Sequence, residues 1–322
     1  MIGILGTGLV ARKIAEYLTD EEFLFFGSSE REVKIGDKVY KSISYDKLNE
    51  YSFDVVFGAT DEKRIKESYE NIKANLLIDN SEAFRQSKLV PLIAAGVNDS
   101  LFNSEVSIVS NPNCVSIMIL NLLYPLHKSM PISKTIMTSL QSVSGMGDKA
   151  LAKLDKERSD YEYLNKHIMP QFELGGRLIR MYDNIVPYVG QTEENLKTHE
   201  ENKIVMELKK VIDENFELDA TCIRVPITYG HTAILHITLK EEVNLQRIRR
   251  LIDLDTDIVY KDLLTIEDAI SDSEHVYATK LRKDPFCPYG FTITLMSNNL
   301  TVGAALNSYR LYKLYKEKKN VL

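Results

Sequence analysis

Short apolar runs alternate with amphipathic stretches through the first third of the chain. The apolar runs are IGIL, FLFFG, DVVFGAT, LLIDN and VSIVS, and the stretches ARKIAEYL and EKRIKESYENIKA between them have helical spacing. Strands that alternate with helices are typical of a parallel sheet, because two parallel strands need a long crossover connection. The pattern therefore predicts an α/β fold that begins with a doubly wound parallel sheet.

The pattern changes after about Pro131. The runs TIMTSLQSV, TCIRVPI and HTAILHITL alternate apolar and polar residues, and they are separated by helical stretches such as LAKLDKERSDYEYLN and EENLKTHEENKIVMELKKVIDENF. Such alternation indicates half-buried strands, so we expect an α+β domain with a mainly antiparallel sheet. A helical pattern from about Leu300 predicts a C-terminal helix that returns to the first domain.

Composition narrows the class of protein. With 322 residues, 44% hydrophobic and 27% charged, the chain suits two domains. A net charge of -6 without a basic block argues against nucleic acid, and no apolar run approaches the roughly 20 residues of a membrane span. The cysteines Cys114, Cys222 and Cys287 lie far apart and show no metal-ligand spacing. We expect a cytoplasmic protein with no metal, no membrane and no nucleic-acid partner.

A glycine-rich turn follows the first predicted strand. Its GxGxxA pattern, at the start of a βαβ unit, indicates a Rossmann-like dinucleotide site in which the backbone approaches a pyrophosphate at a helix N-terminus. The residues expected to bind are Gly6, Thr7, Gly8, Leu9 and Val10. The alternative is a tight turn that only packs the helix on the strand.

The end of the second strand bears on the choice of nucleotide. NAD-binding proteins usually carry an acid there, about 20 residues after the glycines, whereas this chain has Ser28, Ser29 and Arg31. Hydroxyls and a guanidinium suit a 2′-phosphate, so NADP is favoured. Glu30 keeps NAD open, because it could face the ribose.

Cys114 is the candidate nucleophile. It follows Ser110-Asn111-Pro112-Asn113 and precedes an apolar helical run. A sulfur at a helix N-terminus is stabilised as a thiolate by the helix dipole, and the unpaired N–H groups there can hold an oxyanion. Cys222 and Cys287 have no such lead, and Cys222 is expected in the core of a strand.

The candidate proton carrier is His231. It follows Pro226 and Gly230 in a turn between two predicted strands, as functional loop residues often do. His236 is expected on the opposite face of the same strand. The remaining histidines have helical or acidic surroundings and are expected to be surface or packing residues: His127, His167, His199 and His275.

These residues lie in motifs that resemble the aspartate-β-semialdehyde dehydrogenase family along nearly the whole chain. The motifs, in order, are the glycine turn, DNSEAFR from Asp79, VPL with VN near Val90, SNPNC, QSVSGMG from Gln141, NIVP from Asn184, Glu193-Glu194, RVPITYGH from Arg224, and Asn299-Leu300 with Gly303-Ala304-Ala305. The resemblance implies a dinucleotide-binding domain of residues 1–113 and 300–322 around a catalytic and dimerisation domain of residues 114–299. It also implies a homodimer or a dimer of dimers.

The resemblance assigns a role to each matching residue. Cys114 would attack the aldehyde of aspartate semialdehyde, His231 would accept the proton of the hemithioacetal, and hydride transfer to NADP would leave a thioester that phosphate releases. Gln141 would orient the reacting group, with Asn113 beside the nucleophile. The resemblance further implies that Arg224 binds the substrate carboxylate, Arg85 the phosphate and Glu193 the amine. It also implies cofactor contacts by Thr60, Ser81, Gly145, Met146 and Asn299. In the alternative interpretation, Arg85 and Arg224 form surface ion pairs.

One departure from the family pattern affects the phosphate site. The family has a lysine three residues after the amine-binding glutamate, and the alignment that starts at Glu193 puts Leu196 there. Shifting the alignment by one residue pairs Glu194 with Lys197 but loses the match to Glu200-Glu201-Asn202-Lys203-Ile204. Two further hypotheses therefore stay open: a divergent paralogue that reduces another activated acyl group, and a non-catalytic NADP-binding protein.

Overall fold

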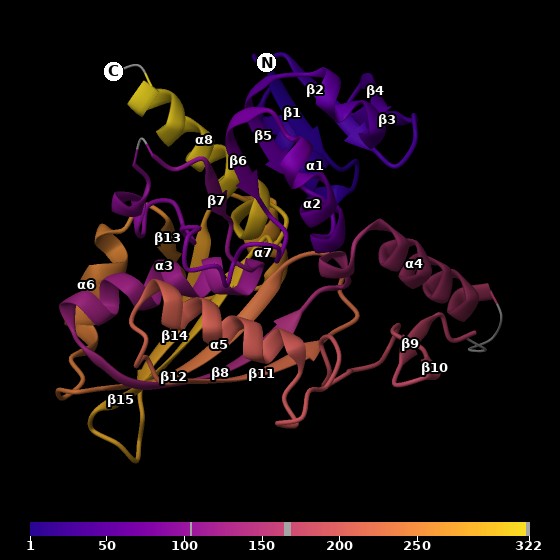
Figure 1. The fold of residues 1–322 in the computed structure, drawn as a ribbon. Coiled ribbons are helices and arrows are strands. Elements are labelled where there is room, and N and C mark those ends of the chain that lie inside the picture. The colour runs from indigo at the N-terminus through magenta and orange to yellow at the C-terminus, as the bar shows by residue number, and fades with distance from the viewer. Residues whose placement is uncertain (104, 164–168, 320–322) are drawn as a thin grey trace. The chain divides into compact units, whose positions relative to one another are not determined.

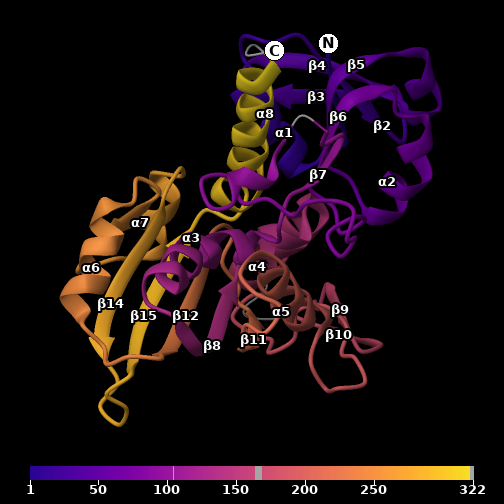
Figure 2. The same ribbon diagram turned by 60° about the vertical axis from the view of Figure 1, so that its left-hand side comes forward.

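The computed structural model describes residues 1–103, 105–163 and 169–319, so His167 lies outside the described residues. The chain forms two compact units, Met1–Ile117 with Leu300–Leu322, and Met118–Asn299. Figures 1 and 2 show the elements of each unit. We refer to them as the first and the second unit.

The first unit contains a seven-stranded sheet in the order β3-β4-β2-β1-β5-β6-β7. All its pairings are parallel except that of β3 with β4, which confirms the predicted parallel sheet. The sequence reasoning missed the β3–β4 hairpin, which turns at Gly36. The strands are β1 (Ile2–Leu5), β2 (Phe23–Gly27), β3 (Glu32–Ile35), β4 (Lys38–Ser44), β5 (Phe53–Gly58), β6 (Ala74–Asp79) and β7 (Ile108–Ser110).

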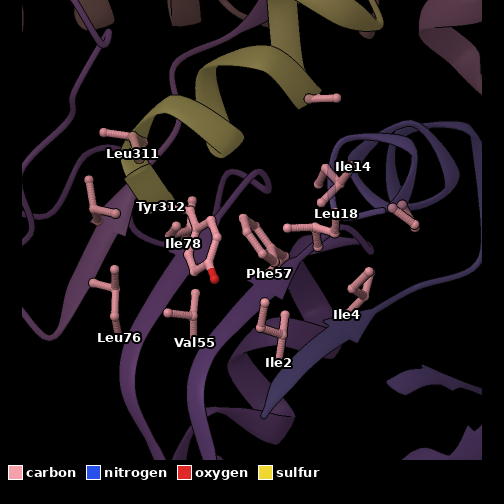
Figure 3. Packing of buried hydrophobic residues seen from close by; sticks show 14 of the residues in the cluster. Ile2, Ile4, Ile14, Leu18, Val55, Phe57, Leu76, Ile78, Leu311 and Tyr312 are labelled. Atoms are coloured by element: carbon pink, nitrogen blue, oxygen red, sulfur yellow. The ribbon is translucent and has the colours of Figure 1, made fainter. Parts of the chain in front are cut away.

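In the described part of this unit, the sheet is accompanied by the α-helices α1 (Leu9–Tyr17), α2 (Glu62–Ser68) and α8 (Leu306–Lys319). In Figure 3, Ile14 of α1 and Leu311 and Tyr312 of α8 lie over strand residues such as Phe57, and all belong to one buried cluster. The ring of Tyr309 also stacks on that of Tyr17 at 5.2 Å between centroids. The C-terminal helix therefore completes the core of the first unit.

The second unit contains a six-stranded sheet in the order β11-β8-β12-β15-β14-β13. Its three central pairings, β8 with β12, β12 with β15 and β14 with β15, are antiparallel, and the two outer pairings are parallel, so the mainly antiparallel prediction is confirmed. The strands are β8 (Ile132–Gln141), β11 (Leu218–Arg224), β12 (His231–Leu239), β13 (Ile258–Tyr260), β14 (Val276–Lys283) and β15 (Gly290–Ser297).

Helices and a hairpin complete the second unit. They are α4 (Asp148–Tyr163), α5 (His199–Val211), α6 (Leu245–Leu254), α7 (Ile266–Ser271) and the hairpin of β9 (Phe172–Leu174) with β10 (Arg177–Ile179). Helix α3 (Cys114–Ser129) begins in the first unit and continues into the second. No helix of the described residues has both the length and the apolar character that crossing a bilayer requires.

Candidate active site

Cys114 is the first residue of α3, as its sequence context predicts. Asn113 caps the helix, because its side-chain Oδ1 accepts a hydrogen bond from Val115 N at 2.9 Å and its backbone oxygen accepts one from Ile117 N at 2.9 Å. The side chain of Cys114 is half-buried, and its Sγ lies 3.9 Å from Asn113 Oδ1. The sulfur therefore sits at the positive end of the helix dipole, where a thiolate is favoured.

Gly303 packs directly on the nucleophile. A Cβ at this position would lie 2.5 Å from Cys114 Cβ and 2.9 Å from its Cα, so only glycine permits this approach. Gly303 belongs to a π-helical turn over Thr301–Ala305 that leads into α8, and Ala305 N donates to Leu300 O at 3.0 Å within it. Turns of this kind are frequent at functional sites.

Buried amides hold the loop that carries Cys114. The Nδ2 of Asn111 donates to Asn80 Oδ1 at 2.7 Å and to Ala304 O at 3.2 Å, and its Oδ1 accepts from Asn307 Nδ2. Asn307 Oδ1 in turn accepts from Ala95 N at 2.7 Å. Because each amide has its donors and acceptors engaged, the network ties the start of α3 to β6 and α8.

Three predicted site residues lie side by side on the sheet of the second unit. Gln141 of β8 pairs with Arg224 of β11 and with His231 of β12, so their side chains share one face. All three side chains are buried. Gly145 packs against two of them, because a Cβ there would be 3.2 Å from Arg224 Nη1 and 3.6 Å from His231 Nε2.

His231 is oriented by the backbone of Ser142. The Ser142 N–H donates to His231 Nδ1 at 3.0 Å, and no residue that the structure describes offers Nε2 a hydrogen-bond partner. Burial, followed by the nearby Arg224 guanidinium, lowers the pKa of His231 to about 3, against the opposing effects of a hydrogen bond with the Gly230 backbone and of the Glu200 carboxylate. The imidazole is therefore neutral at ordinary pH.

Asn299 supports this arrangement from the end of the second unit. Its Oδ1 accepts hydrogen bonds from Gly230 N at 2.9 Å, from Ser144 Oγ at 3.1 Å and from Ser142 Oγ at 3.2 Å. The side chain thus joins the loops on both sides of His231. A cofactor contact by Asn299 stays a prediction, and so do those of Gly145 and the half-exposed Met146.

Helix α5 supplies two charged residues that the sequence reasoning did not place in the site. Lys203 Nζ pairs with Glu200 Oε2 at 2.6 Å, and Gln141 Nε2 donates to Glu200 Oε1 at 3.3 Å. Both charged side chains are largely buried. They share the buried face of α5 with Ile204 and Leu208. Charges at positions of the apolar stripe were the signal that could have revealed them.

Glu193 does not lie beside Gln141. Its exposed carboxylate binds His199 Nδ1 at 2.8 Å and the side chain of Asn202. Leu196 is exposed, and Lys197 pairs with the carboxylate of Asp219. Among the described residues, the glutamate that Gln141 binds is Glu200, which is paired with Lys203, whereas the amine contact of Glu193 stays a prediction.

Arg85 is buried in the first unit, and its Nη2 donates to Asn80 O at 2.7 Å. Ser81 binds the carboxylate of Asp79, from its N at 2.9 Å and from its Oγ at 2.9 Å. Burial raises the pKa of Asp79 despite these bonds. Arg85 is thus no surface ion pair, while its phosphate contact stays a prediction.

The glycine turn of the first unit fits a dinucleotide. Gly6 has φ +120, and a Cβ there would lie 2.1 Å from Ala59 O, so the turn requires glycine. Gly8 caps α1 without a side chain, which leaves the helix N-terminus open to an anion. Leu9 and Val10 form the first turn of α1.

The loop after β2 fits a 2′-phosphate. The Arg31 guanidinium donates to Thr7 Oγ1, and Ser42 Oγ accepts from Arg31 N at 3.1 Å, so this side chain is held at the glycine turn. Glu30 pairs with Lys47 at 3.2 Å, which neutralises the one acid of the loop. Ser28 and Ser29 are exposed beside them, and Thr60 is half-exposed after β5.

Cys222, His236, His127 and His275 lie in ordinary packing or surface surroundings. Cys222 is fully buried in β11, and burial raises the pKa of its thiol to about 12. His236 is exposed on the face of β12 opposite His231, as predicted. His127 packs edge-on against Phe216, and His275 lies 3.3 Å from the carboxylate of Asp272.

The first unit carries a thiol at a helix N-terminus, and the second carries a buried imidazole, amide and guanidinium. Together with the α/β fold, these groups indicate an enzyme of the dehydrogenase class. Residues 123–302 match the family described as semialdehyde dehydrogenase, dimerisation domain. The chain is 31% identical to the aspartate-semialdehyde dehydrogenase of Helicobacter pylori strain J99 over 74% of this chain and 72% of that one. It is 28% identical to that of Rickettsia bellii over 96% of each. This chain belongs to the aspartate-semialdehyde dehydrogenase family.

Solved structures agree with the fold. Aspartate semialdehyde dehydrogenase II of Vibrio cholerae superimposes with a TM-score of 0.86 at 22% identity and covers 98% of both chains. A Candida albicans aspartate semialdehyde dehydrogenase with NADP superimposes with a TM-score of 0.72 at 18% identity, over 99% of this chain and 98% of that one. At these identities the likeness concerns the fold.

Proposed function

We propose that this protein catalyses the reversible, NADP-dependent reductive dephosphorylation of L-aspartyl 4-phosphate to L-aspartate 4-semialdehyde through a thioester on Cys114. The observation that carries the proposal is the row of Arg224, Gln141 and His231, with the Glu200–Lys203 pair bonded to Gln141. Buried ionic groups are costly, so a set of this kind is usually retained for binding or catalysis.

The charges of this cluster match those of the substrate. A guanidinium suits the α-carboxylate, a carboxylate suits the α-ammonium, and a lysine suits a phosphate. We assign these roles to Arg224, Glu200 and Lys203. Lys203 supplies the phosphate-site cation that the alignment at Glu193 lacked, so the reason for invoking a different acyl substrate falls away.

The proposed chemistry begins with the Cys114 thiolate. Its sulfur attacks the acyl carbon, the carbonyl electron pair moves to oxygen, and collapse of this oxyanion expels phosphate and leaves a thioester. We assign Gln141 and His231 to contacts with the reacting group, as the family resemblance implies. Reduction of the thioester needs a hydride, which is the chemistry that a bound nicotinamide would supply. Cleavage of the C–S bond then releases the semialdehyde and regenerates the Cys114 thiolate.

The cofactor proposed for the glycine turn is NADP. Arg31, held by Thr7 and Ser42, would pair with the 2′-phosphate, and the N-terminus of α1 would bind the pyrophosphate. The ion pair of Glu30 with Lys47 argues against a ribose contact by that acid, and hence against NAD. The Candida albicans relative solved with NADP supports the same choice.

The decisive assay is phosphate-dependent NADP reduction with aspartate semialdehyde, run with wild type and with Cys114→Ala. We expect turnover by the wild type and none by the variant. Activity that persists without the sulfur would exclude the thioester, whereas a wild type without turnover would exclude this substrate. NADP binding, measured by fluorescence titration, serves as the control for folding of Cys114→Ala.

Two matched pairs of variants test the assignment on α5. Lys203→Met is expected to raise the KM for phosphate by about 100-fold or more, since it removes a cation that binds the anion. Glu200→Gln should raise the KM for the semialdehyde. Their exposed counterparts, Lys197→Met and Glu193→Gln, should change either KM less than about threefold. The reverse ranking would restore the alignment at Glu193.

We also propose that the protein is a cytoplasmic homodimer in the biosynthesis of lysine, threonine and methionine. The match of residues 123–302 to a dimerisation domain supports a second copy as partner. The face of the second-unit sheet opposite the catalytic row carries partly exposed apolar residues, including Ile136 with 49% exposure and its neighbour Ile234. Replacing Ile136 and Ile234 with Glu should convert the dimer to monomer in analytical ultracentrifugation, and an unchanged mass would place the interface elsewhere.

A further inference from the structure

The sheet of the second unit has a surface cavity at the edge that β13 forms. Helix α6 contacts β13 and β14 there, and Figure 2 shows α6 beside β14. The sheet order places β14 and β15 between β13 and β12, the strand that carries His231. The cavity has a volume of about 470 Å³, within the roughly 300–1,000 Å³ that is typical of small-molecule sites. It therefore has the size of a ligand site and lies apart from the row of Gln141, Arg224 and His231.

Apolar side chains form a large part of the cavity wall. Leu245 and Leu254 come from α6, Tyr260 from β13 and Leu281 from β14. Leu254 is 74% exposed, whereas the other three are half-buried. A ligand that covers an exposed leucine beside other apolar groups removes apolar surface from water, which is favourable. The cavity therefore suits a ligand with an apolar body.

Arg249 presents a fixed guanidinium to this cavity. Its Nε donates to Asp253 Oδ1 at 2.8 Å, and its guanidinium carbon lies 3.9 Å from the centroid of the Tyr260 ring. Stacking on an aromatic face holds the planar group in one orientation. Within the described residues, Nη1 and Nη2 of Arg249 make no hydrogen bond. These two atoms can therefore donate together to a carboxylate.

Arg250 adds a second positive charge to the cavity. Its side chain is exposed and forms an ion pair with no residue that the structure describes. The wall thus contains two arginines and the carboxylate of Asp253, in a chain whose net charge is -6. This local excess of positive charge favours an anion over a cation or a neutral molecule.

A β-bulge in β14 shapes the wall that this strand contributes. The register of β14 against β15 shifts between Thr279 and Arg282, and Lys280 within this segment has φ +54. A left-handed conformation is unfavourable for a residue with a Cβ, and bulges are frequent next to functional sites. In the bulge, Leu281 N donates to Tyr260 Oη at 3.3 Å. The ring on which the guanidinium stacks is therefore itself held in place.

We propose that this cavity binds a small organic carboxylate with an apolar body. The carboxylate accepts hydrogen bonds from Nη1 and Nη2 of Arg249 and faces Arg250, and the apolar body covers Leu254 and Leu281. The proposal does not rest on the proposed function, because the cavity contributes no group to the chemistry assigned to Cys114.

The chain contains no tryptophan, which permits a local fluorescent probe of the cavity. Leu254→Trp places the only tryptophan there, and its fluorescence is titrated with 4-phenylbutyrate. We expect a saturable change with a Kd below about 5 mM. The alcohol 4-phenyl-1-butanol, which lacks the charge, and butyrate, which lacks the ring, should bind at least about tenfold more weakly. Equal affinity for the acid and the alcohol, or a Kd above about 5 mM, would overturn the proposal.

Further variants test the two arginines. In the Leu254→Trp protein, Arg249→Gln with Arg250→Gln should weaken the binding of 4-phenylbutyrate by at least about tenfold. The matched control is Arg247→Gln, on the same helix but outside the cavity wall, and it should weaken binding by less than about twofold. Urea unfolding checks that each variant folds. Equal losses in the double variant and the control would overturn the proposal.

Saturation-transfer NMR on the wild type should rank the three ligands in the same order, and a different order would attribute the fluorescence result to the introduced tryptophan and overturn the proposal. Leu254→Glu tests a second copy of the chain as the occupant. We expect this variant to lose the NMR signal of 4-phenylbutyrate and to keep the wild-type mass in analytical ultracentrifugation. A lower mass would assign the surface to a subunit contact and overturn the proposal. None of these measurements uses turnover, so an inactive wild type would refute the proposed function alone.

Discussion

Replacing Gly303 with alanine is expected to displace the nucleophile. The new Cβ would lie 2.5 Å from Cys114 Cβ and 2.9 Å from Cys114 Cα. Carbon atoms pack at about 3.5–4.0 Å, so the two segments must separate by about 1 Å. The groups that clash are the backbone and Cβ, which no side-chain rotation can move. Either the start of α3 or the π-helical turn must shift.

The expected consequence is a loss of activity that exceeds the loss of stability. Overpacking costs about 1–3 kcal/mol, and a reacting group misplaced by about 1 Å can cost about 100-fold in rate. Gly303→Ala should therefore lower kcat in the phosphate-dependent assay by about 100-fold. Alkylation of Cys114 by iodoacetamide, followed by peptide mass spectrometry, should slow as well.

Gly36→Ala is the matched control for this substitution. Gly36 has φ +54 in the β3–β4 turn, and a Cβ there meets nothing within 4 Å. The control should lose about 1 kcal/mol through backbone strain and keep its kcat. If Gly303→Ala keeps a normal kcat and alkylation rate, Gly303 does not position Cys114. If both variants lose activity alike, the effect is one of stability.

Two further predictions concern stability. Glu157 is fully buried on α4 and accepts hydrogen bonds from Gln171 N at 3.0 Å, Met181 N at 2.7 Å and Tyr182 N at 2.8 Å. Glu157→Ala should lower the free energy of unfolding in urea by about 3–5 kcal/mol. A loss of less than about 1 kcal/mol would contradict the role of Glu157 as an anchor of these loops. The pKa of Asp54 is lowered to about 2, chiefly by Lys319 of α8 and then by the N-terminus, so this carboxylate stabilises the fold above its usual pKa of 3.8 and loses that effect as the pH falls through 2. Because Asp54 is half-exposed, Asp54→Asn should cost only about 0.5–1 kcal/mol at pH 7 and progressively less as the pH falls towards 2 and below. A margin that does not change with pH would contradict the ion pair.

Local patterns were sufficient to predict much of the fold and the position of Cys114 in it. The alternation of IGIL, FLFFG and LLIDN with helical stretches specified the parallel sheet, since crossover connections leave few other arrangements. The Asn-Pro-Asn lead located Cys114 at the first residue of α3. The β3–β4 hairpin was missed because its strands are short, polar and largely exposed, so they lack the hydrophobic period that marks a strand.

There is a physical reason why the sequence alone could not decide between Glu193 and Glu200. The stretch around α5 contains several Glu and Lys residues at i, i+3 spacing, and spacing alone cannot distinguish a buried pair from an exposed one. The structure shows that Thr198 caps α5 with a capping box to Glu201, so the helix begins after Glu193 and Leu196. The position of this first residue determines which residues of α5 share a face. Glu200 and Lys203 lie on the buried face with Ile204 and Leu208.

The buried charges on this face of α5 are tolerated because each has a partner. A lone buried carboxylate would be strongly destabilising, but Glu200 has the ammonium of Lys203 at 2.6 Å and the amide of Gln141 at 3.3 Å. Such a pair contributes little net stability, since replacement by apolar residues of similar size is often neutral or stabilising. The presence of this pair beside Gln141 is therefore more consistent with the binding role that we propose for it than with a contribution to folding. We expect the double variant Glu200→Leu with Lys203→Met to be at least as stable as the wild type but to lose affinity for the semialdehyde and phosphate. That result would separate the contribution of this pair to function from its contribution to stability. A double variant that unfolds would show instead that the charges support the fold itself.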